Sequence, residues 1–195
     1  MFVLTVDQRR SRSREDLVRE ALDVLNTDPA RPLLRGFERT AGDEMQAVAA
    51  DASVAMEIAL DLAASNNWSV GIGIGRVDEP LPESTRAGSG EAFERAREAV
   101  TAAKTSPGNI AVAGARAEAG HAEAVLQLLV SVARKRSREA REAGELSDQG
   151  LTQQQIADRL GITQQAVSSR LHSGLWHECR RGQSAAQALL EGADR

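Results

Sequence analysis

The sequence predicts an α+β fold in which an antiparallel sheet with helices packed on it precedes an all-helical C-terminal part. Three observations support this prediction. Patterns typical of strands and helices alternate over residues 1–115, whereas only helical periodicity is found from about residue 118 onward. Within the helical part, residues 151–181 have the capping residues and the apolar spacing of two helices joined by a tight turn.

The first half of the N-terminal region predicts a strand, a helix and a hairpin. Residues 2–6 (FVLTV) form a continuous apolar run that is typical of a buried strand. A helix with an apolar stripe is expected to begin at Ser13 (SREDLVREALDVL). Two strands are expected over residues 33–40 and 45–49, because the Gly-Asp pair within residues 41–44 favours a tight hairpin turn.

The second half of this region predicts two further helix–strand pairs. Residues 52–65 form an Ala-rich amphipathic helix, and residues 68–75 (WSVGIGIG) form a strand with glycine at alternate positions. After a loop over residues 86–90, residues 91–104 are expected to be a helix and residues 109–114 a closing strand. The resulting order, β-α-β-β-α-β-α-β, indicates a ferredoxin-like antiparallel sheet.

The remaining elements are all predicted to be helices. Residues 118–136 carry one long apolar stripe, Ser137 begins a short helix, and residues 183–190 form a last helix. No long flexible linker separates the two parts of the chain. The predicted division is an α+β domain over residues 1–115, a connecting helix over 116–136 and a helix-turn-helix domain over 137–195.

The turn between the paired helices has the local signals of a helix-turn-helix. Thr152 and Gln155 form a capping box that starts the first helix, Gly161 ends it through a positive φ, and Thr163 caps the second helix. The residues expected to form the core of the motif are Ile156, Ala157, Leu160, Gly161, Val167 and Leu171. The inner face of the second helix is expected to consist of Ala166, Val167, Leu171 and Leu175. This spacing is typical of motifs that place their second helix in the DNA major groove.

The outward face of the second helix carries short amide, hydroxyl and imidazole side chains. Glutamine can pair bidentately with adenine, and serine or threonine can contact bases or phosphates. The predicted base-reading residues are Thr163, Gln164, Gln165, Ser168, Ser169 and His172. The residues expected to neutralise phosphates are Arg159, Arg170, Arg180 and Arg181. A structural helical hairpin with a polar solvent face is the alternative interpretation.

Composition limits the class of protein further. The 195 residues suffice for one domain of typical size and a small second one. No apolar run approaches about 18 residues, and charge follows the first apolar residues instead of preceding them. We therefore expect no membrane span and no signal peptide, and a cytoplasmic location. The single cysteine, Cys179, excludes an intramolecular disulfide and a cysteine-cluster zinc site.

Charge is distributed unevenly along the chain. The net charge is −4, which is unusual for a protein that binds DNA. From Arg134 to the end, however, ten Lys and Arg residues are present against eight Asp and Glu residues. This asymmetry favours the C-terminal part as the one that faces DNA. Because one such weakly basic unit should bind weakly, we expect a homodimer or a larger assembly.

Two carboxylates of the N-terminal region are expected to approach one another. Asp7 ends the first strand, and Asp43 lies in the hairpin turn with Glu44 beside it. Mg²⁺ prefers one or two carboxylates together with waters and nucleotide phosphates. The residues that follow the first strand, and that could bind phosphate at a helix start, are Arg9, Arg10 and Ser11. Alternatively, Asp43 is simply a good turn residue and Asp7 a helix-entry residue.

Several segments together resemble the nucleotide cyclase and GGDEF superfamily. They are an aspartate after the first strand, the string AGDEM over residues 41–45, and VGIGIG over 70–75 followed by GEAFERAREA over 90–99. The nearest likeness is to the SatD-like proteins, including relatives that add a C-terminal helix-turn-helix. The resemblance implies a cyclase-like fold, with the two metal carboxylates of those families at the positions of Asp7 and Asp43.

The resemblance does not extend to the residues of catalysis. The GGDEF signature has Gly where Ala41 stands and Phe where Met45 stands. A class III cyclase carries Asn and Arg near the places of Glu94 and Glu98, and negative charge there would not stabilise a reacting phosphate. The sequence therefore predicts an N-terminal domain that is not an enzyme.

These observations predict a sequence-specific DNA-binding regulator of transcription. We expect it to be a dimer whose N-terminal domain serves dimerisation or nucleotide sensing. This function requires no cofactor. If the N-terminal domain binds a ligand, Asp7 and Asp43 are expected to bind Mg²⁺ together with a nucleotide. Two alternatives stay open. One is a Mg²⁺-dependent enzyme that binds or processes nucleotides. The other is a protein-binding adaptor that contacts RNA polymerase, because the helix-turn-helix also resembles the last domain of sigma factors.

Overall fold

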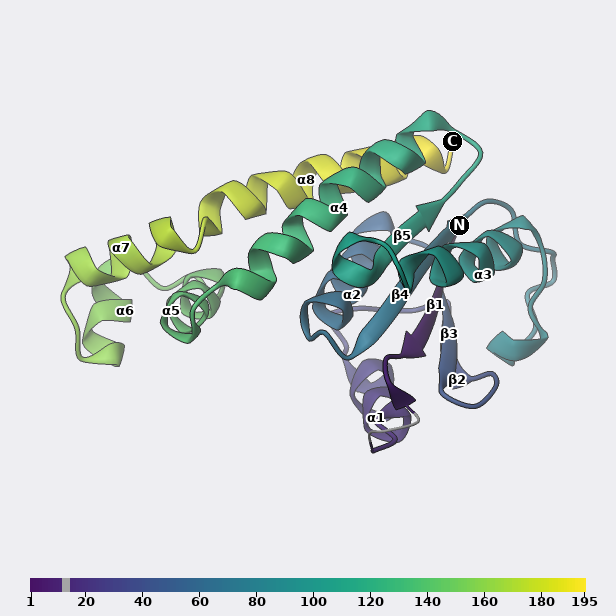
Figure 1. Cartoon of the computed structure of the whole chain (residues 1–195), viewed down its shortest axis with the longest axis horizontal. Helices are drawn as coiled ribbons and strands as arrows, with labels where there is room; N and C mark the ends of the chain where they lie inside the picture. The colour runs from purple at the N-terminus through teal and green to yellow at the C-terminus, as the bar shows by residue number, and fades with distance from the viewer. Residues whose placement is uncertain (12–14) are drawn as a thin grey trace.

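A computed structural model describes residues 1–11 and 15–195 of the chain and has the predicted α+β architecture. A sheet unit comes first and a helical unit projects from it (Figure 1). The elements of the sheet unit are β1 (Phe2–Gln8), α1 (Val18–Thr27), β2 (Arg35–Arg39), β3 (Glu44–Ala49), α2 (Ala52–Ala64), β4 (Trp68–Ile74), α3 (Glu91–Ala103) and β5 (Ile110–Ala113). The helices that follow are α4 (Ala117–Lys135), α5 (Arg138–Asp148), α6 (Gln153–Leu160), α7 (Gln164–Ser173) and α8 (Trp176–Ala193).

The sheet has the strand order β2-β3-β1-β4-β5. Its first four strands are antiparallel neighbours, as a ferredoxin-like plan requires. The expectation of an entirely antiparallel sheet is wrong at one edge, because β5 pairs with β4 in parallel. The physical reason is the connection: α3 crosses over the sheet and returns the chain to the same end, so the next strand runs in the same direction.

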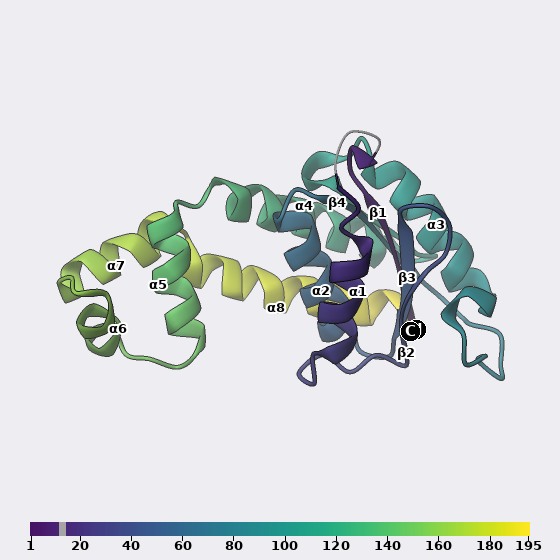
Figure 2. The same ribbon diagram turned by 90° about the horizontal axis from the view of Figure 1, so that it is seen from below.

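Helices cover both faces of the sheet, and Figure 2 shows α3 on one side and α1 and α2 on the other. The larger core lies on the α2 side, where α4 and α8 also contribute buried side chains. On the opposite face, Val3 and Val48 of the sheet pack against Ala92, Phe93 and Ala96 of α3. The helices thus protect the central strands from solvent on both faces.

The first helix begins later than its sequence pattern predicts. Ser13, the predicted start, lies outside the described residues, and α1 itself begins at Val18. The backbone N–H of Leu17 donates to the side-chain oxygen of Gln8 at 2.9 Å, and that of Val18 donates to the carboxylate of Asp16 at 2.9 Å. These side chains satisfy the first free amides of the helix and fix its start there.

The last helix is longer than predicted, running over 18 residues instead of residues 183–190. Gly182, which reads as a break in the sequence, allows close packing, because a Cβ there would lie 2.9 Å from a side-chain carbon of Leu129 in α4. The second helix of the helix-turn-helix ends at Ser173. Leu175 therefore does not belong to its inner face: it has a φ of 49° and is 42% exposed.

The α8 helix contributes to two separate cores. Near its start, Trp176 packs in the core of the helical unit. Farther along, its buried residues join the larger core beside the sheet: Cys179, Ala186, Leu190 and Ala193. The two units are thus connected by α4 before the helix-turn-helix and by α8 after it. No helix in the described part of the chain is long and apolar enough to cross a membrane.

The glycines of β4 allow α3 to approach the sheet closely. A Cβ added at Gly71 would lie 2.2 Å from the backbone nitrogen of Val100 in α3. We expect Gly71→Ala to lower the free energy of unfolding by about 3 kcal/mol, because α3 must move away. Gly120→Ala is the control, since no atom lies within 4 Å of its added Cβ. Urea unfolding of both variants measures the difference, and an unchanged Gly71→Ala protein would contradict this packing.

Candidate nucleic-acid interface

The first helix of the motif, α6, begins and ends as its sequence predicts. The backbone N–H of Thr152 donates to the side-chain oxygen of Gln155 at 2.9 Å, and the N–H of Gln155 donates to the Thr152 hydroxyl at 3.3 Å. This is the predicted capping box. At the other end, Gly161 adopts a left-handed conformation with φ of 65°. The following N–H, of Ile162, donates to the carbonyl of Ala157 at 3.0 Å and closes the turn.

The second helix, α7, is held by its cap and by a small apolar core. The hydroxyl oxygen of Thr163 accepts a hydrogen bond from the N–H of Ala166 at 3.1 Å. Val167 and Leu171 of α7 are buried, and so are Ile156 and Ala157 of α6. The other residues of this core are Ala143, Leu146 and Trp176, with Leu151, Leu160 and Ile162 partly buried against them. Five of the six predicted core residues therefore lie in this core or against it. The sixth, Gly161, is exposed and forms the turn instead.

The side chains expected to read bases remain on the outward surface of α7. Each is exposed: Thr163, Gln164, Gln165, Ser168, Ser169 and His172. Among the described residues, Thr163 is the one member of this set whose side chain forms a hydrogen bond within the protein, the cap to Ala166. Figure 1 shows α7 at the end of the molecule farthest from the sheet. The amide and hydroxyl groups of this face are thus available to an external partner.

The arginines expected to neutralise phosphates have different surroundings. Arg159, in the last turn of α6, is exposed. Arg170 is half-buried, with its guanidinium 4.0 Å from the carboxylate of Glu142 in α5. Arg180 lies 3.7 Å from Asp148, and Arg181 is exposed on α8. Arg159 and Arg181 are therefore the two of the four that form no ion pair with another described residue.

A cluster around Trp176 fixes the join between α7 and α8. The indole N–H donates to the carboxylate of Asp148 at 3.0 Å, while the guanidinium of Arg136 lies 4.3 Å above the ring. The Nε of Arg136 also donates to the carbonyl of Gly174 at 2.8 Å. A Cβ at Gly144 would lie 2.2 Å from the ring, so only glycine allows the indole to rest on α5.

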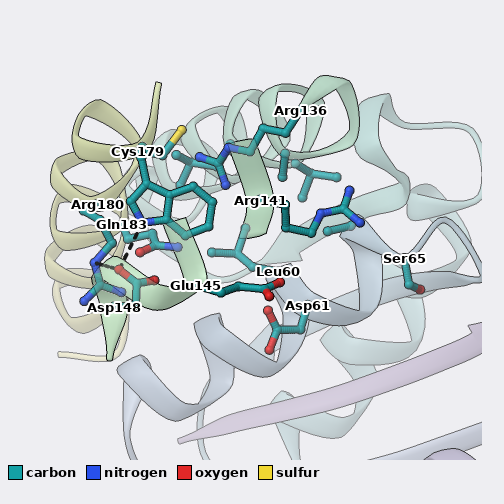
Figure 3. Close-up of a pocket in the computed structure, with 15 residues that line it drawn as sticks. Leu60, Asp61, Ser65, Arg136, Arg141, Glu145, Asp148, Cys179, Arg180 and Gln183 are labelled. Carbon is teal, nitrogen blue, oxygen red and sulfur yellow. Dashed lines mark hydrogen bonds and ion pairs between the residues drawn. The ribbon is translucent and has the colours of Figure 1, made fainter. Parts of the chain in front are cut away.

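The Trp176 cluster borders a hollow of about 520 Å³ between the two units (Figure 3). Asp61 of α2 and Glu145 of α5 are among the residues that line it. No local pattern in the sequence identifies the partners of Trp176, because they lie on other helices. A glycine inside an otherwise regular helix, Gly144, was the one available signal of a close contact there.

Arg134 connects α4 to the sheet unit. Its guanidinium donates to the carbonyls of Ala63 at 2.6 Å and of Gly108 at 2.8 Å. Burial, and secondarily the positive charge of Arg9, lower the pKa of Arg134 from its ordinary value. This side chain therefore positions the helix that leads to the helix-turn-helix and does not face the α7 surface.

The carboxylates predicted to bind Mg²⁺ lie along one edge of the sheet. Asp7 is opposite Glu44 in the β1–β3 pair, and the N–H of Gln8 donates to the carbonyl of Asp43 at 3.2 Å. The carboxylate of Asp7, however, accepts a hydrogen bond from the ammonium of Lys104 at 2.8 Å. An ammonium at that oxygen competes with a metal ion, so this arrangement does not favour a metal at Asp7.

Two other residues predicted to bind metal or phosphate, Glu44 and Arg9, already form hydrogen bonds within the protein. The Thr40 hydroxyl donates to the carboxylate of Glu44 at 2.6 Å, and Arg9 donates to the carbonyl of Asn66 at 3.1 Å. Arg10 has a φ of 61°, and Ser11 is the last residue before the undescribed segment. Among the described residues, no group of three or more His, Cys, Asp or Glu could hold a metal. A nucleotide with Mg²⁺ at this edge stays a prediction.

Comparison with known proteins identifies the helical unit. The family model of Sigma-70, region 4 matches residues 133–177, from the end of α4 to the start of α8. No curated protein and no solved structure matches the chain. The matched segment contains the motif described above and accounts for less than half of the chain. The C-terminal unit is therefore a DNA-binding helix-turn-helix of the kind used in transcription, whereas the SatD-like resemblance stays a prediction.

The close contact between Gly144 and Trp176 leads to a prediction about stability. We expect Gly144→Ala to lower the free energy of unfolding of the helical unit by about 2 kcal/mol, because the added Cβ displaces the indole ring. Amide hydrogen exchange in α7 should then accelerate more than exchange in β1. Gly192→Ala is the matched control, since its added Cβ meets Glu118 only at 3.4 Å. Equal exchange in the two variants would contradict the close packing of Trp176 on Gly144.

Proposed function

We propose that this protein is a sequence-specific DNA-binding regulator of transcription. The observation that carries the proposal is the outward face of α7, whose Gln164, Gln165, Ser168, Ser169 and His172 side chains are exposed above a well-packed core. Amide and hydroxyl groups at the N-terminal end of such a helix can form hydrogen bonds to base edges in the major groove. The match to Sigma-70, region 4 supports the same role for this helix.

In the proposed mechanism the protein binds as a homodimer. The C-terminal region has only a small excess of positive charge, so a single copy would gain little from phosphate neutralisation. Two copies would present two α7 helices to half-sites about one helical turn apart. The sheet unit would then supply the dimer contact, or a site for a nucleotide effector, while α4 and α8 hold the reading helix at a set distance from it.

A second candidate function is that of an adaptor that contacts RNA polymerase. Two observations favour it: the matched family takes its name from sigma factors, and the helical unit is weakly basic. The dependence of DNA affinity on salt separates the two functions. A DNA reader loses affinity steeply as salt rises, because phosphate contacts release counterions, whereas a protein-binding adaptor has no such DNA affinity to lose.

Selection from a pool of random-sequence DNA duplexes tests the proposed reading helix. We expect the wild-type protein to enrich one motif, with two half-sites about 10 base pairs apart. Gln164→Ala should relax the preference at one position of each half-site, at a cost of ~1–3 kcal/mol for the preferred base. Gln187→Ala on α8 is the matched control and should leave the motif unchanged. Identical motifs for Gln164→Ala and the wild type would remove Gln164 from the interface.

The salt dependence of DNA binding tests the phosphate contact of Arg159. We expect Arg159→Gln to weaken binding to all sequences alike and to reduce the slope of log K against log salt by about 1. Arg97→Gln, a change of an exposed arginine on α3, should preserve the slope. Fluorescence anisotropy of a labelled duplex at several salt concentrations measures both. If the Arg159→Gln variant keeps the full slope, the guanidinium of Arg159 does not contact the DNA in the wild-type protein.

A further inference from the structure

A hollow of about 570 Å³ lies at the edge of the sheet where β4 and β5 end. Residues from the end of β4, the start of α3, the β5–α4 connection and the end of α8 line it. Asp7 lies at the opposite edge, because β1 is antiparallel to β4 and pairs its Asp7 with Ser69 at the start of that strand. The hollow is therefore distinct from the edge that carries Asp7 and Asp43.

The topology at this edge is one that favours ligands. The β4-α3-β5 unit is the one parallel pair in the described sheet, and ligands of open α/β sheets bind outside the carboxyl ends of parallel strands. Two helices also begin here, α3 after Gly90 and α4 after Arg116. Neither has a side-chain cap, although backbone carbonyls accept hydrogen bonds from the N–H groups of Ala92 and Ala119 at 3.1 Å. The positive ends of both helix dipoles lie at this edge and favour negative charge there.

Positively charged side chains line the hollow from four segments: the residues after β4, α3, the β5–α4 connection and the residues after α8. The arginines are Arg76, Arg95, Arg116 and Arg195, and the acids are Glu79, Glu91 and Asp194. Two of the acids already have cationic partners, because Arg95 lies 3.3 Å from Glu91 and the Met1 amino group donates to Asp194. Within the described residues, Arg76 has no ion-pair partner, and the nearest acid to Arg116 is Glu118 at 3.7 Å.

Glycines keep the backbone close to these arginines. A Cβ at Gly75 would lie 2.5 Å from a guanidinium nitrogen of Arg95, which donates to the carbonyl of Ile74 at 2.7 Å. A Cβ at Gly90, which has a φ of 117°, would lie 2.8 Å from the carbonyl oxygen of Arg76. The two glycines thus let the end of β4 and the start of α3 come together without side chains that would fill the space between them.

We propose that this hollow binds a small phosphorylated metabolite, with Arg76 and Arg116 contacting its phosphoryl group. Guanidinium groups form paired hydrogen bonds with phosphate oxygens, and helix starts favour the same charge. A phosphoryl dianion matches two guanidinium groups, whereas a single carboxylate matches one. The proposal is independent of DNA reading by α7, since no α7 residue lines the hollow.

Calorimetric titration of the full chain with inorganic pyrophosphate tests this site, at low salt because charge interactions are screened. EDTA in the buffer excludes metal-dependent binding at the Asp7 edge. We expect a dissociation constant below about 1 mM for the wild type. The double variant Arg76→Gln/Arg116→Gln should bind at least about tenfold more weakly, because each lost charged hydrogen bond lowers the affinity. Both side chains are exposed, so the fold should be retained, which circular dichroism checks.

Arg97→Gln is the matched control, because Arg97 is an exposed arginine of α3 that does not line the hollow. Its affinity for pyrophosphate should equal that of the wild type. Three results would overturn the proposal: no heat of binding up to about 10 mM pyrophosphate, equal binding by the folded double variant, or equally tight binding of acetate. Because no DNA is present, these results do not depend on the proposed function of α7.

Discussion

The packing of α8 against α4 is the contact on which the arrangement of this molecule depends. The helix-turn-helix leaves the sheet unit through α4 and returns to it through α8, so it is tied at both ends. Small residues make the contact close: Gly182 lies against Leu129, and Ala186 is fully buried. Leu190 and Ala193 extend the contact into the core beside the sheet. A larger side chain at these positions would separate the helices and with them the two units.

A single aromatic residue, Trp176, links the α4–α8 packing to the orientation of α7. Trp176 is the first residue of α8, and its ring is held between Gly144 on α5 and the guanidinium of Arg136. Arg136 also binds the carbonyl of Gly174, at the point where α7 ends. The same helix that is anchored in the sheet core thus fixes the end of α7. A helix-turn-helix attached by a flexible linker would lack this constraint.

Local signals predicted most of this fold, and contacts between distant segments account for what they missed. The Thr152 capping box and the glycine turn at Gly161 act within a few residues, so the sequence alone identified them. The true start of α1 depends on Gln8, a residue of the preceding strand, and the length of α8 depends on Leu129 of another helix. The same distinction holds at the site. Exposed α7 residues follow from periodicity, whereas the Trp176 cluster needs three helices together.

The double attachment of the helical unit bears on how it would present α7 to DNA. α8 contributes buried residues to both cores, so a change in the angle between the units must break packing in at least one of them. Loss of such packing is costly, and the join between the units therefore favours a fixed geometry over a hinged one. In the proposed homodimer, the spacing of the two α7 helices would be set by how the sheet units of the two copies meet. Specificity for half-site spacing would then reside in the N-terminal part of the chain, and specificity for bases in α7.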